Sequence, residues 1–113
     1  MKIPFLDLRA QYNSINEEVQ ASIQDVFNDT AFASGPYVEK FESNFSSFCN
    51  AKYCIAVNSG TSALHLALLA HGISPGDEII TVPNSFIATT WAISYCGAKP
   101  IFVDVDPQTW LIT

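Results

Sequence analysis

The segment from Asn58 to Leu64 combines the residue types that bind phosphate groups. It runs Asn-Ser-Gly-Thr-Ser-Ala-Leu, so that an apolar run ends, a glycine follows and hydroxyl residues open a predicted helix. A glycine lets the backbone approach a ligand closely, and the free N–H groups and dipole of a helix start favour an anion. A plain N-cap is the alternative, because Ser and Thr are common at helix starts. The segment has neither the lysine of a P-loop nor the spacing of a dinucleotide-binding fingerprint.

Phe86 is the second candidate binding residue, and it follows the next predicted strand after Pro83-Asn84-Ser85. The carboxyl ends of parallel strands share the sheet edge where ligands bind, so we expect Phe86 to lie near Gly60 and Thr61. An aromatic side chain there can stack on a planar heterocycle, although it can also belong to a core. A phosphate cradle beside an aromatic platform indicates a flat, phosphorylated ligand.

Other polar residues have simpler interpretations. Asp104 and Asp106 lie two apart at a strand end and could form a carboxylate pair, but one of them is expected to cap the Asp-Pro turn. His65 lies between leucines in a predicted helix, which is typical of a packed histidine. We interpret Asn84 and Ser85 as helix caps.

Composition excludes several classes of protein. The chain has 113 residues, of which 49% are hydrophobic and 14% are charged, so it is not a disordered segment. A net charge of −6 provides no electrostatic footprint for nucleic acid and little attraction to anionic membranes. The apolar run after Lys2 ends at Asp7, too early for a signal peptide, and the apolar stretch 63–73 is too short to cross a bilayer. We therefore expect no nucleic-acid or membrane partner.

The cysteines predict a reducing environment. Cys49, Cys54 and Cys96 are odd in number, widely spaced and set in apolar segments. Buried free thiols in the cytoplasm are the simplest interpretation. With two histidines and no Cys-x-x-Cys, the sequence predicts no metal site.

The elements that position these residues fall into two parts. Near the N-terminus, a Ser14-x-x-Glu17 capping box and helical spacing predict a helix over 14–27, and Pro36 begins a second helix that ends near Asn50. Strands are predicted at 53–57, 78–82 and 101–105, and a cut-short strand at 110–113. Helices over 63–71 and 86–96, closed by Gly72 and Gly97, separate the three full strands.

This alternation predicts an α/β fold with a parallel sheet, built from β-α-β units. Three strands are fewer than such a sheet usually has, and the chain stops inside an apolar run. We expect an N-terminal part of a longer protein, with a complete small domain as the alternative.

Several segments together resemble one protein family. Residues 59–68 are similar to the phosphate-cradle motif of the DegT/DnrJ/EryC1/StrS aminotransferases, pyridoxal-phosphate enzymes mostly of nucleotide-sugar metabolism. Similar blocks follow the family order along essentially the whole chain, at 3–8, 34–36 with 41–42, 75–80 and 97–106.

The resemblance implies a fold and a cofactor site. The fold would be the N-terminal part of the fold-type-I PLP-transferase large domain, with a mostly parallel sheet and helices on both faces. Residues 1–50 would form an N-terminal helical segment and 51–113 the start of the large domain. The cofactor would be pyridoxal 5′-phosphate, its phosphate held by Gly60 and Thr61, with Ser62 as a weaker candidate, and its ring stacked on Phe86.

It also implies an activity that this chain does not complete. The whole enzyme would be a cytoplasmic homodimer that moves an amino group, usually from glutamate, onto a nucleotide-linked keto sugar. Phe32 and Tyr37 are candidates for the subunit interface. The family's Schiff-base lysine and ring aspartate come after residue 113, and none of the four lysines matches that lysine's position (Lys2, Lys40, Lys52, Lys99). The chain alone is therefore expected to be inactive.

Two alternatives differ from transamination. Some relatives replace the lysine with histidine and dehydrate a sugar, and the deciding residue would again lie after Thr113. The chain could also be a small module that binds a phosphorylated ligand without catalysis. That reading predicts a stop codon directly after Thr113 and cooperative unfolding of the purified chain.

Overall fold

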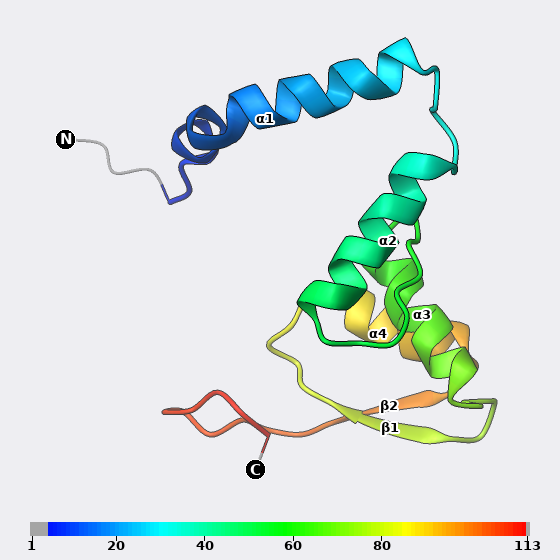
Figure 1. Cartoon of the computed structure of the whole chain (residues 1–113). Coiled ribbons are helices and arrows are strands. Elements are labelled where there is room, and N and C mark those ends of the chain that lie inside the picture. Colours follow the sequence, from blue (N-terminus) through cyan, green and yellow to red (C-terminus); the bar gives the residue numbers. More distant parts are fainter. Residues whose placement is uncertain (1–4, 113) are drawn as a thin grey trace. The chain divides into compact units, whose positions relative to one another are not determined.

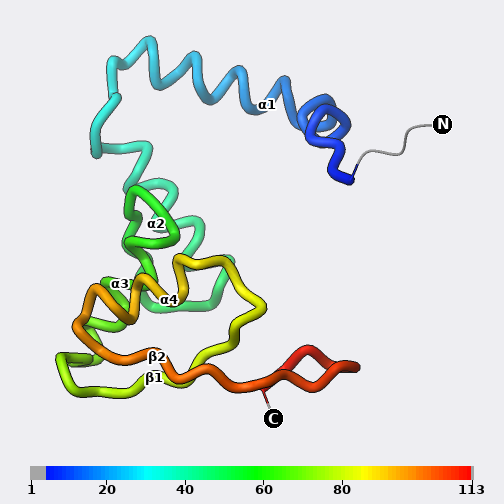
Figure 2. The backbone as a smooth tube through the Cα atoms, turned by 180° about the vertical axis from the view of Figure 1, so that it is seen from behind, coloured from blue at the N-terminus to red at the C-terminus, as the bar shows by residue number. Residues whose placement is uncertain are grey.

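The computed structural model describes residues 5–112, which form helices and a small parallel sheet (Figure 1 and Figure 2). The chain divides into two compact units, Met1–Ala56 and Val57–Thr113. The division into 1–50 and 51–113 expected from the sequence concerns the domains of the whole protein and stays a prediction.

The first helix, α1 (Leu8–Asn28), begins well before residue 14, where the sequence pattern placed its start. Asp7 is the N-cap, and its Oδ1 accepts a 3.0 Å hydrogen bond from the Ala10 N–H, one of the N–H groups that a helix start leaves free. The Ser14 hydroxyl instead donates to the Gln11 carbonyl, at 2.7 Å, inside the helix. The predicted capping box at Ser14 is therefore wrong.

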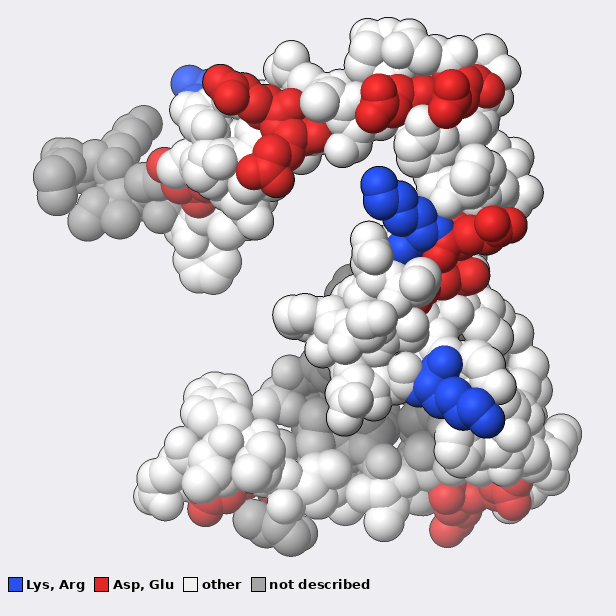
Figure 3. Space-filling model, viewed as in Figure 1, with Lys and Arg blue, Asp and Glu red and all other residues white. Residues whose placement is uncertain are grey.

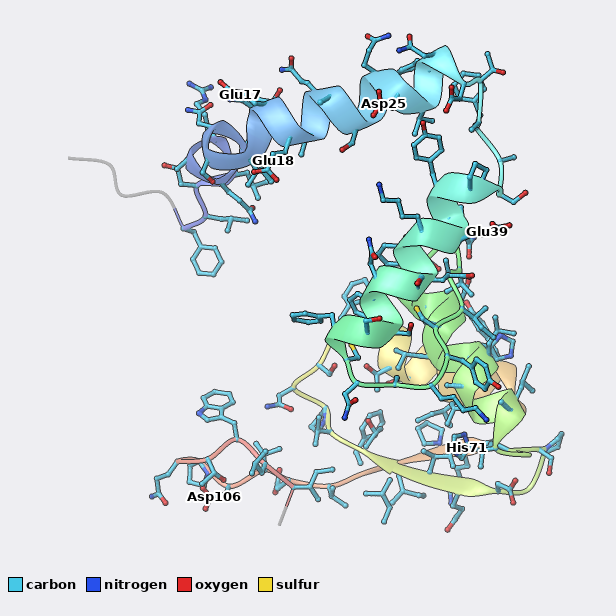
Figure 4. The ribbon with its side chains drawn as sticks, viewed as in Figure 1. Glu17, Glu18, Asp25, Glu39, His71 and Asp106 are labelled. Carbon is cyan, nitrogen blue, oxygen red and sulfur yellow. The ribbon has the colours of Figure 1, made fainter. Side chains whose placement is uncertain are left out.

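Acidic side chains dominate the charge of α1. Glu17, Glu18 and Asp25 lie along it, and Arg9 is its one basic residue (Figure 3 and Figure 4). This helix thus carries part of the net charge of −6 of the chain.

The second helix, α2 (Pro36–Phe48), starts as predicted, with Pro36 at its first position. Gly35 precedes it with φ +88°, a conformation that favours glycine. The aromatic rings of Phe41, Phe45 and Phe48 follow the predicted spacing along one face, with successive centroids 5.5 and 6.1 Å apart. All three rings are exposed.

The apolar run 53–57 is not a strand, contrary to the prediction. It has no regular secondary structure, and no neighbouring strand pairs with it among residues 5–112. A strand requires a ladder of hydrogen bonds to a neighbour, which an apolar pattern alone cannot supply. Tyr53 and Ile55 are correspondingly exposed.

The second unit contains the parallel sheet. Strands β1 (Glu78–Thr81) and β2 (Lys99–Phe102) pair in parallel, with Glu78 opposite Lys99, and are connected through α4 (Ala88–Tyr95). Helices α3 (Gly60–Ala70) and α4 lie on the same side of the two strands in both views (Figure 1 and Figure 2). The predicted parallel α/β arrangement is confirmed.

Strand β2 (Lys99–Phe102) corresponds to the strand predicted at 101–105, but it begins and ends earlier in the chain. The Lys99 Nζ forms a 2.9 Å ion pair with Glu78 Oε1, and the Lys99 N–H donates to the Asp77 carbonyl at the start of the ladder. At the other end, Pro83 follows β1 closely and has no N–H to donate. The ladder therefore ends shortly after Phe102, where the Val103 N–H still donates to the Thr81 carbonyl at 3.0 Å.

The core lies between α4, the strands and α3. Ile93, Cys96 and Ala98 are buried, and Leu68, Ile73 and Ile79 pack against them. Gly97 allows this packing, because its φ is +74° and a Cβ there would lie 2.7 Å from Pro75 Cγ. This confirms Gly97 as the residue that closes α4.

The last described residues form a turn rather than the predicted strand at 110–113. Val105 and Ile112 form one antiparallel bridge around the turn at Asp106, and Trp110 has φ +60°. Thr113 lies outside the described residues.

Three further observations concern residues 5–112 only. No helix there is both long enough and apolar enough to cross a membrane. No group of three or more His, Cys, Asp or Glu side chains is placed to hold a metal ion. Cys49, Cys54 and Cys96 all carry free thiols, but only Cys96 is buried, so the expected burial is wrong for Cys49, which is exposed.

Candidate functional site

The start of α3 presents two free backbone donors. The N–H groups of Gly60 and Thr61 have no hydrogen-bond acceptor among residues 5–112. They are the first two N–H groups of an 11-residue helix, where the dipole is positive. The Thr61 hydroxyl likewise has no partner in the described part of the chain. These groups can donate to an anion without breaking an existing bond.

Ser62 has its donors committed to its own loop. Its N–H donates to Ser59 Oγ at 3.1 Å, and its hydroxyl donates to Asn58 Oδ1 at 2.7 Å. The Ser59 hydroxyl in turn donates to Ser62 Oγ at 3.0 Å. The N-cap and the free donors therefore coexist: Ser59 caps α3, while Gly60 and Thr61 stay available.

The surrounding protein does not explain why residue 60 is a glycine. A Cβ at this position would meet no atom within 4 Å, and Gly60 is not among the glycines with positive φ. Neither crowding nor backbone strain in the described structure requires glycine there. The space that a side chain would enter is open to a ligand, which fits close approach of a phosphate to the backbone.

Gly60, Thr61 and Phe86 meet at one open cavity of about 550 Å³. Such a volume is in the usual range for small-molecule sites. Phe86 lies between β1 and α4 and is 74% exposed. The cavity is also lined by Ala63, Leu64, Ala88 and Thr89, so no charged side chain of the described residues contributes to it.

Local hydrogen bonds hold the loop that carries Phe86. The Thr89 N–H donates to the Phe86 carbonyl at 3.1 Å, and the Ser85 and Thr89 hydroxyl oxygens lie 3.0 Å apart. Ser85 is therefore not the N-cap that we expected: the cap of α4 is Ile87, which makes no side-chain capping bond. Asn84 is not that cap either, since α4 begins only at Ala88.

The remaining polar candidates lie outside this cavity. Asp106 Oδ1 accepts the N–H groups of Gln108 and Thr109, at 3.0 and 2.7 Å, at a turn (Figure 4). Hydrogen bonds from Thr109 and Gln108 lower the pKa of Asp106, so this carboxylate caps the turn, as predicted. His65 packs edge to face against Tyr95, with centroids 5.6 Å apart, as expected for a packed histidine.

Sequence reasoning did not single out Thr89, and it gave Asn58 no role of its own within the segment 58–64. Thr89 lies in the first turn of α4 and lines the cavity, and Asn58 orients the Ser62 hydroxyl. The available signal for Thr89 was a hydroxyl residue in the helix turn that follows Phe86. Which partner a short polar side chain selects depends on its rotamer, and spacing does not reveal that.

Comparison with known proteins places this chain in a family. The profile of the DegT/DnrJ/EryC1/StrS aminotransferase family matches residues 13–113. The chain belongs to this family. The expected fold class, the N-terminal part of a fold-type-I PLP-transferase large domain, is confirmed by solved aminotransferases that share it.

Individual relatives are similar over nearly the whole chain. A "Pleiotropic regulatory protein" of Geobacillus stearothermophilus is 41% identical over 99% of this chain and 30% of its own length. The UDP-2-acetamido-2-deoxy-3-oxo-D-glucuronate aminotransferase of Pseudomonas aeruginosa is 40% identical over 96% of this chain and 30% of its own. The crystal structure of NtdA from Bacillus subtilis, with bound cofactor PMP, has a TM-score of 0.91 at 42% identity, over 99% of this chain and 26% of that one. The chain thus spans less than a third of these relatives.

Proposed function

We propose that this chain is the N-terminal part of a pyridoxal-phosphate-dependent aminotransferase that acts on a nucleotide-linked keto sugar. The observation that carries the proposal is the cavity where Gly60, Thr61 and Phe86 meet, in a chain of this aminotransferase family. Free N–H donors and an exposed aromatic ring suit a flat phosphorylated ligand, and pyridoxal 5′-phosphate is one.

Gly60 and Thr61 would bind the cofactor phosphate. Their N–H groups and the Thr61 hydroxyl donate to phosphate oxygens, and the positive end of α3 stabilises the charge. The described residues that line the cavity carry no positive charge to balance the phosphate, so neutral hydrogen-bond donors would bind it. Ser62, whose hydroxyl already donates to Asn58, supports the loop and is the weaker of the predicted phosphate ligands.

Phe86 would cover one face of the pyridine ring. The Ser85 and Thr89 contacts hold its loop, so the phenyl ring can stack on the cofactor and exclude water from that face. When bound, pyridoxal 5′-phosphate supplies an electrophilic carbonyl and an electron-withdrawing ring for amino-group transfer.

The lysine that forms the Schiff base would lie in a further part of the protein. Among residues 5–112, no lysine lines the cavity. Lys99 pairs with Glu78, and the Lys52 Nζ lies 5.1 Å from the centre of the Tyr53 ring. Lys2 lies outside the described residues. The 113 residues alone would therefore be inactive.

The finer predictions for the whole protein belong to the same proposal. They are glutamate as amino donor, a homodimer and a cytoplasmic location. The free thiols of the three cysteines suit a reducing compartment. Phe32, which is 67% exposed, and Tyr37 remain the candidates for the subunit interface.

The coding sequence downstream of codon 113 tests this proposal. An open frame with a family-matched lysine and a ring aspartate supports it, and the expressed protein should then convert glutamate to 2-oxoglutarate with a nucleotide-linked keto sugar. Histidine in place of the lysine would instead indicate a sugar dehydratase. A stop codon directly after Thr113 would contradict the enzyme and leave a module that binds a phosphorylated ligand.

A further inference from the structure

Glu42 makes the hydrogen bond that fixes the segment leading to the candidate phosphate site. Its Oε1 accepts the Ala56 N–H at 2.7 Å, across 14 residues of chain. The contact is partly buried, and both residues belong to the first compact unit. A short bond from an amide to a carboxylate is charge-assisted and is stronger than a neutral one.

The partner of this bond lies where the backbone has little other support. Among residues 5–112, segment 52–57 has no regular secondary structure, pairs with no strand and makes no backbone–backbone hydrogen bond. Ala56 precedes Asn58 by two residues, and Asn58 Oδ1 holds the Ser62 hydroxyl at the N-cap of α3. Along the chain only Val57 separates Ala56 from Asn58, so the bond that fixes Ala56 lies two residues before the start of the phosphate cradle.

We propose that Glu42 is a positioning residue: through its bond to the Ala56 N–H it sets the backbone that carries Asn58, Gly60 and Thr61 for phosphate binding. Glu42 is not among the residues that line the cavity, so it would act through the backbone and not on the ligand. This inference rests on the proposed function, because the ligand whose affinity it sets is pyridoxal 5′-phosphate.

The test titrates the protein made from the complete reading frame with pyridoxal 5′-phosphate and follows cofactor absorbance. Glu42→Ala should raise the Kd about tenfold, the scale of one charge-assisted hydrogen bond. Glu42→Gln keeps an oxygen that can accept the Ala56 N–H, so its Kd should stay within about threefold of wild type. Glu42→Asp keeps the charge but shortens the reach, and should fall between the two.

Glu39→Ala is the matched control. Glu39 lies on the same helix, is exposed, and its side chain accepts no hydrogen bond within residues 5–112 (Figure 4). Its replacement removes the same charge and should leave the Kd unchanged. At saturating cofactor, kcat of Glu42→Ala should return to within about twofold of wild type, because only positioning of the cradle is weakened.

Amide hydrogen exchange gives a readout that does not depend on the cofactor. The Ala56 N–H should exchange faster in Glu42→Asp than in wild type and stay protected in Glu42→Gln, even where Glu42→Ala fails to fold. Unchanged Kd and Ala56 protection in the Asp and Ala variants, with wild type binding normally, would overturn the positioning role alone. A wild-type protein that binds no pyridoxal 5′-phosphate would overturn the proposed function itself, and this inference with it.

Discussion

Two neighbouring hydroxyl residues at the start of α3 differ in how their donors are used. Thr61 lines the cavity, and its N–H and hydroxyl have no acceptor in residues 5–112. The Ser62 N–H donates to Ser59 Oγ, and the Ser62 hydroxyl donates to Asn58 Oδ1. A phosphate can therefore recruit Thr61 without competition, but it must displace Asn58 to recruit the Ser62 hydroxyl.

This difference predicts unequal effects of two conservative changes. Thr61→Val removes a hydroxyl that would donate to a charged phosphate, and should raise the Kd for pyridoxal 5′-phosphate roughly tenfold or more. Ser62→Ala should change it less than about threefold. Fluorescence or absorbance titration of both variants measures this, and a larger effect from Ser62→Ala would contradict the assignment.

Residue types and their order along the chain predicted which residues meet, although the strand expected at 53–57 is absent among residues 5–112. The glycine and hydroxyl residues after one apolar run, and an aromatic residue after the next, were expected at one sheet edge, and Gly60, Thr61 and Phe86 do meet at one cavity. Their role in binding the cofactor stays a prediction. The Asn58–Ser62 bond and the contribution of Thr89 depend on side-chain rotamers, which spacing does not encode.

At the scale of elements, local signals predict helices better than strands. Pro36 after Gly35 marks the start of α2, and Gly97 closes α4, because both act through their own backbone. The start of α1 was missed because Asp7 caps it and Ser14 does not. Segment 53–57 has the composition of a strand, but pairing depends on a neighbour that the local pattern cannot supply.

A hydrogen bond from a titratable group, the Tyr37 hydroxyl, links the start of α2 to the end of α1. The Tyr37 hydroxyl donates to Asp29 Oδ2 at 2.7 Å, just after the end of α1. This bond, with the nearby carboxylates of Asp29 and Asp25, raises the pKa of Tyr37 from 10.0 to about 12.

The sign of this shift predicts how the connection responds to pH. The folded chain favours the neutral phenol of Tyr37. The contribution of this hydrogen bond to the free energy of unfolding is therefore complete below pH 10, the pKa of a free tyrosine, and is lost as the pH rises through about 12. In an absorbance titration of tyrosinate, one ionisation should occur near pH 12, above the others, and Tyr37→Phe should remove that step. If Tyr37→Phe leaves the last ionisation unchanged, the hydrogen bond to Asp29 is not present in solution.

At the scale of the whole molecule, the described residues bury few side chains. The core consists of small or medium residues near α4, whereas large apolar groups such as Ile80, Trp91 and Tyr95 are exposed. The relatives are more than three times as long as the part that this chain matches. Cofactor binding is therefore best measured on the protein made from the complete reading frame.

Gly60→Ala tests the central claim most directly. A Cβ at Gly60 meets no protein atom within 4 Å, so the free energy of unfolding should be unchanged or rise by up to about 1 kcal/mol, the difference in helix propensity. The same methyl group would enter the space assigned to the cofactor phosphate, so the Kd for pyridoxal 5′-phosphate should rise at least about tenfold, the scale of one lost hydrogen bond to a charged group. Titration of wild type and Gly60→Ala with this cofactor, beside their thermal unfolding, measures both effects. Equal affinity in the two proteins would contradict the account of the phosphate cradle.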